Sequence, residues 1–296
     1  MLKSNGSRKF GLSIIHLVFI LFSVACLIPL LSVISISLSS EKDLIHFGYG
    51  ILPRKIDFTA YKFILHNPWQ IMNAYFITGA VTIIGTLISL IINTMIAYAL
   101  SRPNFKYKNK ITFYIFFTML FGGGLVPWYM LIRNYLHLSN TIWALIVPNL
   151  AAPWFIFILR TFFSKIPISL AESAKIDGAR EFFIYRKIIL PLSKPALATV
   201  GLFIALGYWN DWWLCLLFID KNNLINLQYM LHRIMSNIDF LQSTLNRGIV
   251  NIDISTIPTE SARMAMLILS IGPMLFLLTF LQKHFVKGLT LGAIKG

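Results

Sequence analysis

Long apolar stretches alternate with short polar ones along most of the chain. Six stretches reach the length of about 20 residues that a helix needs to cross a bilayer. We place them at Leu12–Leu38, Ala74–Leu100, Ile111–Ile132, Thr141–Phe163, Pro195–Ile219 and Ala262–Gln282. The pattern therefore predicts an all-α, polytopic membrane protein with six transmembrane helices.

Two of the predicted spans contain residues that weaken helices. The third holds three consecutive glycines, Gly122, Gly123 and Gly124, and the fourth holds Pro148 and Pro153. Glycines in a span permit close helix packing, or they mark a break that lines a cavity. The sequence leaves both interpretations open, and either one makes this position able to flex.

Composition agrees with a membrane protein. Hydrophobic residues make up 57% of the 296 residues and charged residues only 12%, whereas a soluble domain has about 25% charged residues. The start of the chain, with Lys3, Arg8 and Lys9 before an apolar run, is similar to a signal peptide. The run continues from Phe10 to Ser40 without a charge, which is longer than a signal-peptide core, so we interpret it as a retained first span.

Lysine and arginine indicate the orientation. If the N-terminus is cytoplasmic, the cytoplasmic segments hold most of the 26 basic residues, as the positive-inside rule requires. Six spans then leave both termini in the cytoplasm of a multi-pass cell membrane protein, whereas an odd number would leave the basic tail outside. The orientation of the chain in the lipid bilayer therefore accounts for the net charge of +15, and we expect no nucleic acid partner.

The most informative stretch is a polar insert at 166–191, between the fourth and fifth spans. Pro167 ends the preceding span, and Ser169 with Glu172 fits a capping box that opens a short helix. Asp177-Gly178 predicts a turn, because glycine takes a positive φ easily. A second helix follows over 179–189 and ends at Leu190-Pro191. From the residues alone, the insert is either a docking element or an amphipathic loop on the bilayer surface.

The insert resembles the "EAA" signature of ABC importer permeases. The residues in register are Glu172, Ala174, Gly178, Ile188, Leu190 and Pro191, and Ser173 stands where the family usually has alanine. The resemblance implies that Glu172, Ser173, Ala174, Asp177, Gly178, Ile188, Leu190 and Pro191 couple the chain to a separate ATP-binding subunit. Independently of the resemblance, Ala171 and Ala174 give the first helix of the insert a small-residue face that is suited to packing in a groove.

The rest of the chain resembles carbohydrate-uptake permeases of the maltose type, a MetI-like family. The closing segments 282–288 and 292–296 carry this resemblance, while 121–127 and 227–231 are similar to the subgroup for aldouronate and other complex oligosaccharides. The resemblance implies a type I ABC importer permease fold. It divides the chain into an N-terminal span with an external segment (1–73), a five-helix core (74–282) and a cytoplasmic tail (283–296).

The resemblance also implies the partners. These are a second homologous permease subunit, two ATP-binding subunits, an extracytoplasmic solute-binding protein and an oligosaccharide substrate. The sequence has no Gly-x-x-x-x-Gly-Lys-Ser/Thr phosphate loop, so ATP and magnesium belong to the partner subunits and this chain binds no cofactor. We expect no catalytic residues and no metal ligands, because the six histidines are scattered along the chain.

A candidate substrate pathway lies in the fifth span, at Trp209, Asn210, Asp211 and Trp212, together with Gly122–Gly124. Acids at membrane depth often face protein or water and carry function, and aromatic faces can stack on sugar rings. The alternative is an aromatic belt at the external interface. The external loop 220–261 either docks the binding protein, covers the pathway or is simply solvated. A non-sugar importer and a non-transporting scaffold are the alternative functions.

Overall fold

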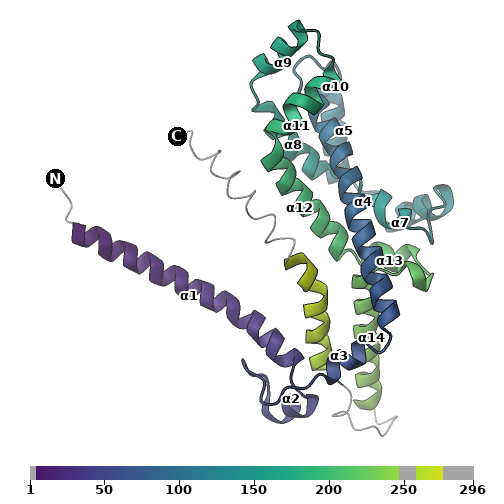
Figure 1. The fold of residues 1–296 in the computed structure, drawn as a ribbon. Coiled ribbons are helices and arrows are strands. Elements are labelled where there is room, and N and C mark those ends of the chain that lie inside the picture. The colour runs from purple at the N-terminus through teal and green to yellow at the C-terminus, as the bar shows by residue number, and fades with distance from the viewer. Residues whose placement is uncertain (1–4, 247–257, 276–296) are drawn as a thin grey trace. The chain divides into compact units, whose positions relative to one another are not determined.

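The computed structural model describes residues 5–246 and 258–275 (Figure 1). In these residues all regular structure is helical, apart from one isolated β-bridge between Ser39 and Ile56. The predicted all-α fold is confirmed. The predicted cytoplasmic tail, 283–296, lies outside the described residues.

The chain forms two compact units. The first combines the part up to Pro68 with Arg233–Pro273, and the second runs from Trp69 to His232 before the chain returns to it at Met274. The topological division predicted from the sequence follows the order of the spans, and it stays a prediction.

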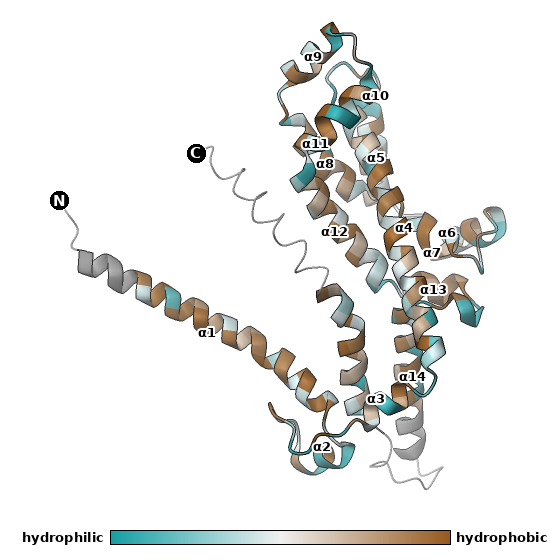
Figure 2. Ribbon diagram, in the orientation of Figure 1, coloured by the Kyte–Doolittle hydropathy of each residue, from teal (hydrophilic) through white to brown (hydrophobic). Residues whose placement is uncertain are grey.

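The first unit contains α1 (Asn5–Ser37), α2 (Glu41–Phe47), α3 (Thr59–Ile64) and a helix over 260–275. Hydrophobic residues dominate α1 (Figure 2), and its side chains from Leu12 to Leu31 are all exposed, whereas Ser35, Ile36 and Ser37 at its end are buried. Lipid or another subunit must therefore cover this helix. Asp57 accepts hydrogen bonds from the amide and hydroxyl of Thr59 at the start of α3, and these bonds hold the pKa of Asp57 below its usual range.

Glu41 joins α2 to the start of helix 260–275. Its side chain is buried, with 7% exposed, and its carboxylate accepts four hydrogen bonds. The donors are the Thr259 hydroxyl (2.5 Å), the Glu260 amide (3.0 Å), and the amide (3.2 Å) and hydroxyl (2.9 Å) of Ser261. Free amides at a helix N-terminus favour a negative charge, so we name this arrangement the Glu41 cap.

The second unit contains the other helices. Its first part comprises α4 (Pro68–Ser101), α5 (Lys108–Leu120), α6 (Leu125–Met130), η1 (Leu131–Tyr135), α7 (Trp143–Ile146), η2 (Val147–Asn149) and α8 (Pro153–Ser164). Its second part comprises α9 (Ile168–Ile176), α10 (Glu181–Ile184), η3 (Tyr185–Ile189), α11 (Leu190–Leu192), α12 (Lys194–Asn210), α13 (Trp213–Phe218), η4 (Asn222–Leu224) and α14 (Leu227–Asn246), which continues into the first unit.

Two helices, α4 and the Leu12–Ser37 part of α1, are long and apolar enough to cross a membrane alone. Three bent helix pairs raise the number of candidate spans in the described residues to at most five. The predicted sixth span, Ala262–Gln282, is described only through helix 260–275, and its remainder lies outside the described residues.

The breaks predicted from glycine and proline are present, and they are sharper than interruptions of straight spans. α5 and the segment Leu125–Tyr135 meet at 113° across Gly122–Gly124, and the segments on either side of residues 150–152 meet at 50°. Gly124 has a φ of 83°, which a residue with a Cβ rarely adopts. The predicted fifth span is also broken, because α12 ends at Asn210 and α13 begins at Trp213.

Side chains on neighbouring helices satisfy the backbone at the break before α8. Asn93 and Ser89, both fully buried on α4, donate hydrogen bonds to the Leu150 carbonyl at 2.9 and 2.8 Å, and the Asn93 side-chain oxygen accepts one from the Ala152 amide. The Tyr208 hydroxyl donates to the Ile146 carbonyl at 2.9 Å. Irregular backbone at membrane depth needs such partners, because no water is present to replace them.

Candidate functional site

The insert 166–191 begins with α9, which starts earlier than predicted. Pro167 occupies the N-cap position with a non-helical backbone (φ −54°, ψ 127°), and no side chain caps the helix. The predicted capping box of Ser169 and Glu172 is therefore wrong, because Pro167 turns the chain out of α8 and Ser169 already lies within the first helical turn.

The predicted turn at Asp177-Gly178 is confirmed. Gly178 has a φ of 81°, its amide donates to the Lys175 carbonyl at 3.0 Å, and the Ala179 amide donates to the Ala174 carbonyl at 2.9 Å. This pair of bonds defines a Schellman motif, in which a residue in the left-handed conformation ends a helix. Glycine adopts that conformation with little strain, so the sequence fixes both the end of α9 and the direction of the next helix.

The second arm of the insert runs from α10 through η3 to α11. It passes Pro191 and ends at Leu192, slightly beyond the predicted end at Leu190-Pro191. A proline inside a helix lacks an amide and crowds the carbonyl one turn earlier. The wider π-helical turn of η3 ends at Ile189, two residues before Pro191. The chain then bends by 84° at Ser193 into α12.

Most of the predicted coupling residues lie on the surface of the insert. Glu172, Ser173, Asp177, Gly178 and Pro191 are exposed, whereas Ala174, Ile188 and Leu190 are half-buried. Ala171 is buried within its own chain with 4% exposed, so of the predicted small-residue face only Ala174 remains partly accessible. Larger apolar side chains are exposed on the surface of the insert. Ile176 is 87% exposed, and Phe182 and Phe183 are also exposed.

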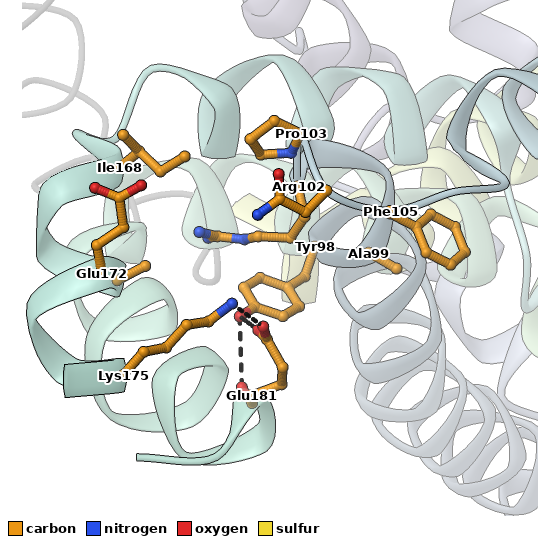
Figure 3. A pocket seen from close by; sticks show the side chains of 11 residues that line it. Tyr98, Ala99, Arg102, Pro103, Phe105, Ile168, Glu172, Lys175 and Glu181 are labelled. Carbon is orange, nitrogen blue, oxygen red and sulfur yellow. Dashed lines mark hydrogen bonds and ion pairs between the residues drawn. The ribbon is translucent and has the colours of Figure 1, made fainter. Parts of the chain in front are cut away.

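Three side chains tie the insert to the end of α4 (Figure 3). Lys175 on α9 places its Nζ 2.5 Å from Oε1 of Glu181 on α10. The Tyr98 hydroxyl on α4 donates to Oε2 of the same carboxylate at 2.6 Å. We name this group the insert link. It joins both arms of the insert to a membrane-spanning helix.

Two further contacts fix the ring of Tyr98. The Arg102 guanidinium carbon lies 4.4 Å from the centre of that ring, and the centre of the Tyr185 ring lies 5.4 Å away. The hydroxyls of Tyr185 and Thr94 lie 2.8 Å apart, which gives η3 its own hydrogen bond to α4. Beside the link, residues 102–105 and α9 enclose a cavity of about 360 Å³.

The candidate pathway residues of the fifth span lie at the break between α12 and α13. Asp211 accepts hydrogen bonds from the Asn149 side chain at 3.1 Å and from the Leu214 amide at 2.9 Å. The broken fourth and fifth spans are thus joined at their breaks. Trp212 is half-buried and stacks on His232, with ring centres 4.4 Å apart.

The predicted pathway residues do not all have the same surroundings. Asn210 is exposed, whereas Trp209 is buried. A cavity of about 380 Å³ lies beside Asn149, Phe203, Gly207 and Tyr208. Gly122–Gly124 are not among the described residues that line this cavity. The structure therefore does not place these glycines and the cavity in one site.

Sequence reasoning missed Ser89, Asn93, Asn149 and Tyr98. Polar residues within an apolar run are rare and usually satisfy backbone or carry function, so Asn93 gave a usable signal. Tyr98 gave none, because tyrosine is common near the ends of spans. The described residues contain no group of three or more histidine, cysteine, aspartate or glutamate side chains that could hold a metal ion.

These features define the class of protein. Broken membrane spans are typical of transporters, and this helical subunit combines them with a polar two-helix insert. A solved structure supports this class. The chain superposes with a TM-score of 0.78 and 29% identity on a chain of a bacterial ABC transporter involved in the import of the acidic polysaccharide alginate, covering 96% of this chain and 99% of that one.

The chain belongs to the family described as the binding-protein-dependent transport system inner membrane component, whose model matches residues 6–291. Two relatives from Bacillus subtilis are each 34% identical. The polygalacturonan/rhamnogalacturonan transport system permease protein YtcP is matched over 94% of this chain and 95% of the relative, and protein LplC over 91% and 90%. The chain is therefore a permease subunit of an ABC importer and a component of the inner membrane.

Proposed function

We propose that this chain is one of two transmembrane subunits of an ATP-driven importer for oligosaccharides, delivered by an external solute-binding protein. The geometry of the insert is the observation that carries the proposal. Two short helices meet at the Gly178 turn, and their exposed surface bears Glu172, Ser173 and Ile176. Such an element can bind a cleft in a partner, and its connections to α8 and α12 can transmit movement.

In this proposal the insert binds one of two ATP-binding subunits in the cytoplasm, where both termini of the chain also lie. ATP and magnesium are used by those subunits, and this chain binds neither. A second, homologous permease completes the pathway and covers exposed apolar helices such as α1. ATP binding and the loaded binding protein must favour the same conformation, because a ligand shifts an equilibrium only through its different affinity for the two states.

The proposed substrate pathway passes the break at Asn210–Trp212. Asn210 is exposed and Trp212 is half-buried, so a sugar could contact both, whereas buried Trp209 supports the wall. The role of Gly122–Gly124 in this proposal is to let α5 and α6 change their angle. The relatives named for polygalacturonan and alginate favour an oligosaccharide that contains uronate.

The test uses the complete importer, purified through a tag on this chain and reconstituted in proteoliposomes. With ATP and the binding protein supplied, we expect labelled oligogalacturonides to accumulate, and neutral maltooligosaccharides to compete weakly. Accumulation of an amino acid, peptide or metal ion without any oligosaccharide would replace the sugar assignment. Failure of an ATP-binding subunit to purify with the tagged chain would contradict the coupling role of the insert.

A further inference from the structure

Tyr98 reaches from a membrane-spanning helix into the insert. Its side chain is buried, with 8% exposed, near the end of α4. Its hydroxyl meets Glu181, the first residue of the second arm, and Glu181 in turn meets Lys175 on the first arm. One carboxylate therefore bridges the two arms across the Gly178 turn and connects both of them to α4 (Figure 3).

The insert link is poorly suited to stabilising the fold. The side chains of Lys175 and Glu181 are 45% and 54% exposed. Exposed ion pairs contribute little to stability, because water screens the charges and both side chains lose freedom. What the link provides is geometry, since each oxygen of Glu181 accepts from a different element.

Contacts other than the insert link fix the side chain of Tyr98, whereas one side of α9 faces a cavity. The guanidinium of Arg102 and the ring of Tyr185 both contact Tyr98, and Tyr185 is itself bonded to Thr94 on α4. In contrast, the cavity of about 360 Å³ lies between α9 and residues 102–105. On that side only Ala171 of α9 is buried, and the cavity leaves space beside Ile168 and Glu172, so the position of α9 relative to α4 depends strongly on the link.

We propose that Tyr98 and Glu181 are positioning residues that make the insert and α4 move as one body. This inference rests on the proposed coupling function and extends it. The covalent chain leads from the insert directly to α8 and α12, whereas α4 is reached only by side-chain contacts. The link therefore gives the partner's movement a second route into the membrane, through the helix that also carries Ser89 and Asn93.

The experiment measures the distance between spin labels at Ser169 on α9 and Leu87 on α4. Both positions are exposed, and the background variant C26A removes the exposed native cysteine. In the complete importer we expect one narrow distance distribution, unchanged when ATP and vanadate are added. In Y98F and E181Q we expect a distribution about twice as wide, which shifts when ATP and vanadate are added.

A second readout is the amount of labelled oligogalacturonide transported per ATP hydrolysed. A hydrogen bond to a charged group changes an equilibrium by roughly tenfold, so we expect Y98F to lower this ratio about threefold to tenfold, while the amount of assembled complex stays the same. The matched controls are Y114F, which removes an exposed hydroxyl from α5, and K110M, which removes an exposed lysine. Both should behave as the unmodified importer does.

The outcomes separate the inference from the function on which it rests. Narrow, unshifted distances in Y98F, E181Q and K175M would overturn the inference, as would a shift in the unmodified importer. If the importer with Y98F does not assemble, the spin-label distances measured in E181Q and K175M, which change the exposed ion pair, test the inference instead. Absence of ATPase activity in the unmodified complex contradicts the proposed function, while the width of the nucleotide-free distribution still tests the link.

Discussion

The Glu41 cap and the insert link use the same chemical group in two different surroundings. Glu41 is buried and accepts four hydrogen bonds from the start of one helix. Glu181 is about half exposed and accepts from one lysine and one tyrosine that lie on different helices. Burial makes every unpaired partner of Glu41 costly, whereas water can replace the partners of Glu181. The first carboxylate is therefore a permanent anchor, and the second is a connection that can transmit movement and be remade.

The largest effect should come from breaking the turn that holds both sides of the insert link. In G178P, proline fixes φ near −65° where the chain has 81°. The Schellman motif cannot form, so we expect oligosaccharide uptake to fall to background while the protein still inserts in the membrane. The matched control is G178N, because asparagine tolerates a positive φ, and it should retain most of the uptake. Normal uptake by G178P would refute the role of the turn.

The Glu41 cap should show its effect in stability. E41A leaves two hydroxyls and two amides without their acceptor, and we expect a loss of about 3 kcal/mol. The measurement is the midpoint of heat-induced loss of monodisperse protein in detergent, which should fall by several degrees. K42A changes the exposed neighbour and should leave the midpoint in place. An unchanged midpoint in E41A would show that the cap is not an anchor.

A smaller effect should follow from crowding the contact between α4 and Tyr208 of α12. A Cβ on Gly85 would lie 2.7 Å from the ring of Tyr208, whereas nothing lies within 4 Å of a Cβ on Gly79 of the same helix. Overpacking of this kind destabilises by about 1–3 kcal/mol. We therefore expect G85A to lower the same thermal midpoint and G79A to leave it equal or higher. Equal midpoints for the two variants would show that the ring of Tyr208 can move aside at little cost.

The smallest stability effect should be that of K175M. An exposed ion pair contributes about 1 kcal/mol or less, so the midpoint of K175M should stay within error of the unmodified protein. The same variant should still widen the distance distribution between α9 and α4. A large fall in the midpoint, comparable with that of E41A, would make the link an anchor and remove the difference between the two regions.

Sequence reasoning reached most of the features that short segments determine, although the local capping box of Ser169 and Glu172 was wrong. The apolar runs, the glycine and proline breaks and the Gly178 turn all depend on neighbours within a few residues, and each is present. It could not reach contacts between distant segments. Glu41 meets residues 259–261, more than 200 positions away, and Tyr98 meets Glu181 across 83.

The 84° bend at Ser193 determines the direction in which movement of the insert acts. A displacement along the second arm of the insert is therefore nearly perpendicular to the axis of α12 and tilts that helix. α12 has 17 residues, so it is about 25 Å long, and a displacement of about 3 Å at its start tilts it by about 7°. The far end of that helix leads into Asp211 and its bond to Asn149. A small lateral movement at one membrane surface thereby becomes a rotation that reaches the proposed sugar pathway.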